Sequence, residues 1–276
     1  MMNSATNNLP KEESSILESN NVSFYYIHEE EKAVIDASFK IQQGDFIGAI
    51  GPNGSGKSTL LKLAAGILQP SKGELYYRRQ AINDYKKKDF AKLAAWIPQE
   101  ASMVFPFKTQ DVVLMGRYPY KSGFNFETAE DLEIASEAME LTGTKFLFGK
   151  RFTEISGGEK QRILIASALA QKPETLILDE PISFLDIKYQ IEILEILRVL
   201  NQKHSVTVII ALHDLNLASK YCSRLLLLKE GQIVREGSPN SILEKSIIES
   251  VYETQIKTLT DEEDGSLIVL PRTKNN

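Results

Sequence analysis

Short apolar runs alternate with amphipathic stretches along most of this chain. The runs Phe46–Ile50, Thr175–Leu178 and 206–211 are apolar at nearly every position, which is typical of parallel strands covered on both faces. The stretches between them show helical spacing of apolar residues. This alternation predicts an α/β domain built around a parallel sheet.

Both ends of the chain depart from this alternation. Residues 1–19 are rich in Asn, Ser and Glu and predict a flexible tail. Residues 22–26 and 33–41 alternate between apolar and polar and predict two strands, so the N-terminal part is expected to be β-rich. Residues 225–234 predict a hairpin, followed by a helix and by a C-terminal strand and tail at 261–276.

Residues of about 101–171 carry a third, helical pattern. Thr128 and Asp131 fit a capping box at the start of one helix. Helical spacing predicts that this helix buries Leu132, Ala135, Met139 and Thr142. The same spacing predicts that a later helix, which follows Asp186, buries Ile187, Ile191, Leu194 and Leu197. We therefore expect a helical lobe inserted into the α/β core.

A glycine-rich turn follows the first buried run. Its residues are Gly51-Pro52-Asn53-Gly54-Ser55-Gly56-Lys57-Ser58-Thr59, and a helical stretch comes next. An ordinary turn is the simpler alternative, but G-x-x-x-x-G-K-S between a strand and a helix is a P-loop, whose backbone N–H groups surround phosphates. Lys57 is expected to reach the β and γ phosphates, and the Ser58 hydroxyl to bind Mg²⁺. The pattern predicts a nucleoside triphosphate site.

Polar residues follow the other two buried runs. Asp179 and Glu180 come directly after one run and His213 comes after the other, at the sheet edge where ligands bind. We expect Asp179 to help hold Mg²⁺, Glu180 to orient or deprotonate the attacking water, and His213 to contact the γ phosphate. Tyr26 ends an N-terminal strand, where stacking on an adenine ring and simple packing are equally compatible with the sequence.

A second glycine-rich helix start lies at Ser156-Gly157-Gly158-Glu159. Ser156 can cap the helix while Glu159 bonds back to the N–H of Ser156. The first backbone donors then stay free for a phosphate. Because adjacent glycines disfavour a helix, we expect some group to approach this backbone closely.

Composition sets outer limits on the function. The chain is 42% hydrophobic and can bury a sizeable core. Its net charge of −5 argues against a dedicated nucleic-acid binder. The single Cys222 cannot form an intrachain disulfide, which fits a reducing compartment, and is expected to be a buried apolar residue. No apolar run approaches the ~18 residues that a membrane span needs, and the polar start does not predict a signal peptide.

Taken in order, these motifs resemble those of the ATP-binding subunit of ABC transporters, over about residues 21–237. The resemblance implies a P-loop NTPase (RecA-like) core with an N-terminal antiparallel β part and an inserted helical subdomain. The implied ATPase domain is 20–260, with the core at about 20–100 and 172–240. Cofactors would be ATP and Mg²⁺.

The resemblance also assigns residues that periodicity alone does not. It makes Tyr26 the adenine-contacting aromatic, Gln99 the Q-loop glutamine that contacts nucleotide and Mg²⁺, and Asp186 part of the D-loop. It makes Ser156, Gly157 and Gly158 a signature that binds the ATP held by a second subunit, in a head-to-tail dimer with another copy or a paralogous ATPase. Ile155 and Ile182 replace the usual leucine and threonine but remove no polar catalytic group.

Partners follow from the resemblance as well. It implies a permease in the membrane, docked near Gln99 at the cytoplasmic face, and indirectly a substrate-binding protein, with no nucleic acid. Residues 115–119 and 212–216 are similar to those of importers of iron-siderophore, haem and cobalamin chelates. The alternative is a soluble ABC ATPase outside transport, for example of the iron–sulfur-assembly type. A P-loop kinase would leave the second glycine-rich helix start unexplained.

Overall fold

The computed structural model of the chain describes residues 15–26, 32–99, 105–121 and 127–272. Its strands are β1 (Leu17–Tyr25), β2 (Lys32–Ile41), β3 (Phe46–Ile50), β4 (Lys72–Tyr77), β5 (Gln80–Ala81), β6 (Ala94–Ile97), β7 (Thr175–Leu178), β8 (Thr207–Ala211), β9 (Arg224–Lys229), β10 (Gln232–Gly237), β11 (Ile256–Thr260) and β12 (Leu267–Pro271). Its α-helices are α1 (Lys57–Ala64), α2 (Lys87–Phe90), α3 (Thr109–Met115), α4 (Ala129–Leu141), α5 (Gly157–Ala170), α6 (Ile187–His204), α7 (Leu215–Tyr221), α8 (Pro239–Ile242) and α9 (Lys245–Tyr252).

The main sheet is six-stranded, in the order β10-β9-β3-β8-β7-β6. From β9 to β6 neighbouring strands run parallel, and β10 closes one edge as the antiparallel half of a hairpin with β9. Every residue of β3, β7 and β8 is buried, because helices or a second sheet cover both faces. The predicted parallel sheet and terminal hairpin are confirmed.

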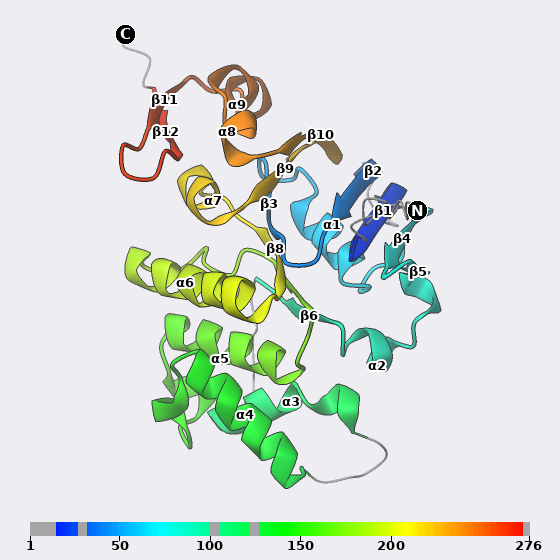
Figure 1. Cartoon of the computed structure of the whole chain (residues 1–276), viewed down its shortest axis with the longest axis vertical. Coiled ribbons are helices and arrows are strands. Elements are labelled where there is room, and N and C mark those ends of the chain that lie inside the picture. Colours follow the sequence, from blue (N-terminus) through cyan, green and yellow to red (C-terminus); the bar gives the residue numbers. More distant parts are fainter. Residues whose placement is uncertain (1–14, 27–31, 100–104, 122–126, 273–276) are drawn as a thin grey trace, which may run out of the picture.

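A second, four-stranded antiparallel sheet, β2-β1-β4-β5, forms the predicted N-terminal β part. Helix α1 lies beside this sheet and close to β3 (Figure 1). Alternate residues of β3 point to opposite faces: Ile47 and Ala49 join the core that contains α1, whereas Phe46 and Ile50 join the larger core on the other face. The P-loop is thereby held between two packed layers.

Helices α3, α4 and α5 contact one another and form the green group at the bottom of Figure 1. The predicted capping box is present, since the side chain of Thr128 accepts from Asp131 N and the Asp131 carboxylate accepts from Thr128 N. The predicted core stripe of α4 is wrong at Leu132, which is 52% exposed. The buried face instead runs through Asp131, Ile134, Ala135, Ala138 and Met139, because Asp131 is turned inward to meet Arg117.

The predicted stripe of α6 needs a similar correction. Leu194 and Leu197 are buried as expected, but Ile187 and Ile191 are exposed. The first two turns of α6 lie beside the start of α5, where Tyr189 and Glu192 make the contacts. The buried stripe therefore begins only at Ile193.

Both chain ends hold more structure than the sequence predicted. Leu17 and Ser19 already belong to β1 and are buried, so the tail predicted for 1–19 ends earlier; residues 1–14 lie outside the described residues. Beyond residue 238, two helices and the hairpin of β11 and β12 replace the predicted helix and single strand. The apolar spacing there is too short to separate these elements.

Candidate active site

The P-loop connects β3 to α1 and lines a cavity of about 640 Å³. Gly56 caps α1 at a φ of 97° and no side chain caps the helix, which leaves the first backbone N–H groups to a ligand. A Cβ at Gly56 would lie 2.3 Å from the carbonyl oxygen of Ala33. Glycine is thus required at this position by both conformation and space, and the loop is suited to phosphate.

Lys57 extends across this loop. Its side chain is almost fully buried, and Nζ donates hydrogen bonds to the carbonyl oxygens of Gly51 and Pro52, at 2.9 and 3.1 Å. Burial lowers the pKa of Lys57, while the carboxylates of Glu180 and Asp179 oppose that shift. The ammonium group is therefore within the field of both acidic residues, as a phosphate-binding lysine should be.

Ser58 and Asp179 provide the residues expected for Mg²⁺. The Ser58 hydroxyl donates to Asp179 Oδ1 at 2.8 Å, and burial raises the pKa of Asp179. In the described parts of the chain, no group of three His, Cys, Asp or Glu side chains is arranged to hold a metal. Mg²⁺ usually takes one or two protein ligands and completes its shell with phosphates and water. The donor pair fits the ion.

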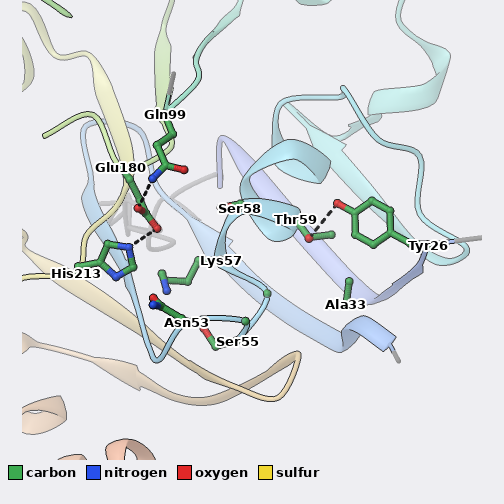
Figure 2. Close-up of a pocket in the computed structure, with 12 residues that line it drawn as sticks. Tyr26, Ala33, Asn53, Ser55, Lys57, Ser58, Thr59, Gln99, Glu180 and His213 are labelled. Atoms are coloured by element: carbon green, nitrogen blue, oxygen red, sulfur yellow. Dashed lines mark hydrogen bonds and ion pairs between the residues drawn. The ribbon is translucent and has the colours of Figure 1, made fainter. Parts of the chain in front are cut away.

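Glu180 is surrounded by polar groups from both neighbouring strands. Strand β7, which it follows, lies between β6 and β8. Gln99, after β6, donates Nε2 to Glu180 Oε2 at 2.9 Å, and His213 Nε2, after β8, lies 2.6 Å from Glu180 Oε1 (Figure 2). The Ser183 hydroxyl also donates to Oε2, at 3.1 Å. With a φ of +49°, Glu180 adopts a conformation that is costly for a non-glycine residue.

Tyr26 lies at the opposite end of the cavity (Figure 2). Its hydroxyl is 3.3 Å from Thr59 Oγ1, and its ring meets Phe24 edge to face at 4.9 Å. Tyr26 therefore packs against its neighbours and also lines the cavity. An aromatic ring beside the P-loop can stack on a base, so the adenine assignment stays a prediction.

The structure separates the predicted site residues into two groups. The residues that line one cavity are Tyr26, Asn53, Gly54, Ser55, Gly56, Lys57, Ser58, Thr59, Gln99, Glu180 and His213. Gly51, Pro52 and Asp179 are not in its lining but are hydrogen-bonded to Lys57 or Ser58, which are. Ser156, Gly157, Gly158 and Asp186 are not among the lining residues. Ser156 nevertheless caps α5 as predicted, in a capping box with Glu159. Asp186 precedes α6 and makes no side-chain cap bond.

Two further residues contribute without having been predicted. Ser183 supports the Glu180 carboxylate, and its position three residues further on was an available but weak signal. Ala33 contributes its backbone carbonyl beside Gly56, which no side-chain pattern can reveal. Gln99 is bonded to Glu180, and its predicted role toward Mg²⁺ stays a prediction.

Fold and pocket together define a P-loop nucleotide-binding protein. The family model described as ABC transporter matches residues 34–183, more than half of the chain. The chain belongs to the ABC transporter family, and the resemblance that the motifs indicated is confirmed.

Several individual ATP-binding proteins of this family are similar to the chain in sequence. The chain is 38% identical to an uncharacterized ABC transporter ATP-binding protein, YvrA, of Bacillus subtilis, over 83% of this chain and 52% of that protein. It is 36% identical to the cobalamin import ATP-binding protein BtuD of Halobacterium salinarum, covering 86% and 59%. It is 37% identical to the ferric enterobactin transport ATP-binding protein FepC of Escherichia coli, covering 84% and 86%. The chain thus spans little more than half the length of the first two relatives.

Solved structures agree with the fold. A putative metal-chelate type ABC transporter in an inward-facing conformation matches with a TM-score of 0.83 and 29% identity, over 95% of this chain and 99% of that one. A dimeric ATP-binding cassette in a post-hydrolysis state, bound to ADP and Pi, matches with a TM-score of 0.71 and 27% identity, over 81% and 98%. The predicted P-loop NTPase fold is confirmed.

Proposed function

We propose that this chain binds and hydrolyses ATP to power a membrane importer of metal chelates, of the iron-siderophore, haem or cobalamin class. The observation that carries the proposal is the convergence of Lys57, Ser58 and the Glu180 cluster in one cavity, with Asp179 hydrogen-bonded to Ser58. The names of the cobalamin and ferric enterobactin relatives support the cargo class.

Each group in the cavity has a distinct chemical task. The P-loop N–H groups and Lys57 bind the phosphates. Ser58 and Asp179 would hold Mg²⁺, which would supply positive charge to neutralise the charge that develops during phosphoryl transfer. Glu180 accepts the proton of the attacking water. Gln99 and His213, bonded to the two oxygens of Glu180, orient that carboxylate and contact the γ phosphate side of the site.

A second subunit completes the site. The capped helix start at Ser156 is exposed and lies outside the P-loop cavity, yet it is suited to bind an anion. In a head-to-tail dimer, with another copy or a paralogous ATPase, Ser156 to Gly158 and Asp186 would cover the nucleotide on the neighbouring P-loop. ATP would then stabilise the closed dimer, and hydrolysis would release it.

We assign the permease surface to the helical lobe, in the segment of the chain that follows the Q-loop residue Gln99. Phe107, Met115 and Tyr118 are exposed apolar or aromatic residues that line a groove of about 700 Å³, with Asp111 and Lys121 also in its wall. Such a groove suits a short helix with an apolar face and polar ends. Within the described residues no helix is both long and apolar enough to cross a bilayer. Docked on a permease, the chain would act at the cytoplasmic membrane face, with a substrate-binding protein as indirect partner.

The test is Glu180→Gln, which keeps the shape and removes the base. We expect turnover to fall by roughly 10²–10⁴-fold, with ATP affinity retained and an ATP-dependent dimer accumulating. Glu140→Gln, an exposed change in the lobe, is the matched control. Unchanged hydrolysis in Glu180→Gln would refute the catalytic assignment, and co-purification of soluble partners alone would favour the non-transport ATPase.

A further inference from the structure

The second glycine of the signature is in close contact with another helix of the same chain. Gly158 has the ordinary backbone of α5, without a positive φ. A Cβ built on it would lie 2.8 and 2.9 Å from Cγ and Cδ1 of Tyr189, in α6. Glycine is required here by the tyrosine ring rather than by backbone conformation. This is the close approach that the paired glycines predicted.

Other contacts join the same two helix starts. A Cβ at Gly157 would be 3.5 Å from Leu185 Cδ2, an ordinary van der Waals distance. One turn further along, Arg162 Nη1 of α5 lies 3.5 Å from Glu192 Oε2 of α6. The first two turns of α5 and α6 therefore form one packed unit, with Tyr189 against the backbone of the signature.

This unit is connected to the catalytic carboxylate by a short, hydrogen-bonded turn. Ser183 donates to Glu180 Oε2, and Leu185 N donates to the carbonyl oxygen of Ile182 at 3.2 Å. Gln190 Nε2 of α6 donates to the same carbonyl at 3.3 Å. A continuous set of contacts thus runs from Glu180 through residues 182–186 to Tyr189 and Gly158.

We propose that Tyr189 is a positioning residue that fixes the signature helix relative to this chain's own hydrolytic site. Its ring holds the Gly158 backbone, so residues 183–186 and the start of α5 move together. Tyr189 is not among the residues that line the P-loop cavity. The proposal rests on the proposed function in one respect, that Ser156 to Gly158 bind the ATP of a neighbouring subunit.

The contact itself is tested in the monomer by amide hydrogen exchange. Tyr189→Ala should raise exchange at Lys160 to Arg162 by about tenfold, because the start of α5 loses its support. Tyr189→Phe, which keeps the ring, should leave that exchange unchanged. Tyr85→Ala removes a half-buried tyrosine elsewhere and is the matched control. Equal exchange in Tyr189→Ala and the wild-type chain overturns the proposal whether or not the protein dimerises.

The consequence for function is tested in the Glu180→Gln background. Tyr189→Ala should weaken MgATP-dependent dimerisation by roughly tenfold or more, as expected for a misplaced binding group, while ATP binding to the monomeric P-loop changes less than about twofold. Tyr189→Phe should dimerise like its parent. A loss of monomer ATP affinity equal to the loss of dimerisation would overturn the positioning role. If the parent itself does not dimerise, the proposed function fails and the exchange result still decides the contact.

A steric exchange provides an independent check. Gly158→Ala should impair dimerisation because its methyl group meets the Tyr189 ring. Adding Tyr189→Ala makes room, so the double variant should dimerise better than Gly158→Ala alone. No recovery would mean that the methyl group acts elsewhere, which contradicts the assignment. Thermal denaturation of each variant, compared with Tyr85→Ala, identifies loss by unfolding.

Discussion

The helical lobe contains a buried ion pair whose removal should be costly. Arg117 donates Nε to Asp131 Oδ1 at 2.8 Å and Nη1 to the carbonyl oxygen of Ala170 at 2.7 Å. The two charged side chains are only 6% and 10% exposed. The centroid of the Tyr120 ring lies 3.9 Å from the Arg117 guanidinium carbon. One arginine thereby joins the end of α3 to the start of α4 and the end of α5.

The change to make is Asp131→Asn. Asparagine keeps the size of the side chain and an oxygen that can accept from Thr128 N, so the helix cap is partly retained. The buried guanidinium loses its counter-ion, which costs about 3–5 kcal/mol of unfolding free energy. At an m-value of roughly 3 kcal/mol/M in urea, the unfolding midpoint should fall by about 1 M or more.

Acid should remove the same stabilisation from the wild-type chain. The hydrogen bond from Arg117 holds the pKa of Asp131 below its ordinary value of 3.8. The folded carboxylate binds a proton less readily than the unfolded one, so its contribution is complete above pH 3.8 and is lost as the pH falls through the lowered value. The difference between wild type and Asp131→Asn should therefore shrink in strong acid.

Urea unfolding at neutral and acidic pH measures both effects. Glu140→Gln is the matched control, because it breaks the Lys145–Glu140 pair in the same lobe, whose side chains are 59% and 70% exposed. Exposed pairs contribute about 0–1 kcal/mol. If Asp131→Asn lowers stability no more than Glu140→Gln, the argument from burial is wrong.

Three further predictions concern the cavity. Lys57→Ala should weaken ATP binding by roughly 10–100-fold, the size of a hydrogen bond to a charged group; an unchanged Kd by titration would contradict its phosphate role. Gly56→Ala should abolish nucleotide binding, because its methyl group would meet the Ala33 carbonyl oxygen and the left-handed conformation costs about 1–2 kcal/mol; calorimetry that detects normal binding would refute this. His213→Ala should lower kcat by about 10²-fold with little change in KM. A kcat equal to that of the wild-type chain would show that His213 has no catalytic role.

The local sequence pattern was sufficient to predict those strands in which every residue is buried. Phe46–Ile50 and Thr175–Leu178 are covered on both faces, so their uninterrupted apolar runs identify them as buried strands. The buried faces of helices were harder to predict, because different parts of one helix pack against different neighbours or face solvent. Ile187 and Leu194 share a spacing in α6, yet only Leu194 lies in the core.

The candidate site shows the same division. The P-loop is one continuous stretch of sequence, and so is the Asp179–Glu180 pair, so each can be recognised from the sequence alone. The order of strands in the sheet then brings His213 and Gln99 beside Glu180. Support from Ser183, from the Ala33 carbonyl and from Tyr189 depends on tertiary contacts. Those contacts follow no period, so the sequence could indicate only that something must approach Gly158.

The backbone of Glu180 explains why this carboxylate needs so many partners. A φ of +49° turns the chain sharply at the end of β7, and a non-glycine residue held there costs about 1–3 kcal/mol unless its surroundings enforce it. Gln99 and His213 enforce it from the strands on either side, and Ser183 enforces it from the turn that follows. Since that turn continues into the α6 unit around Tyr189, the residue proposed to activate water and the residues proposed to cover a neighbour's nucleotide would share one support.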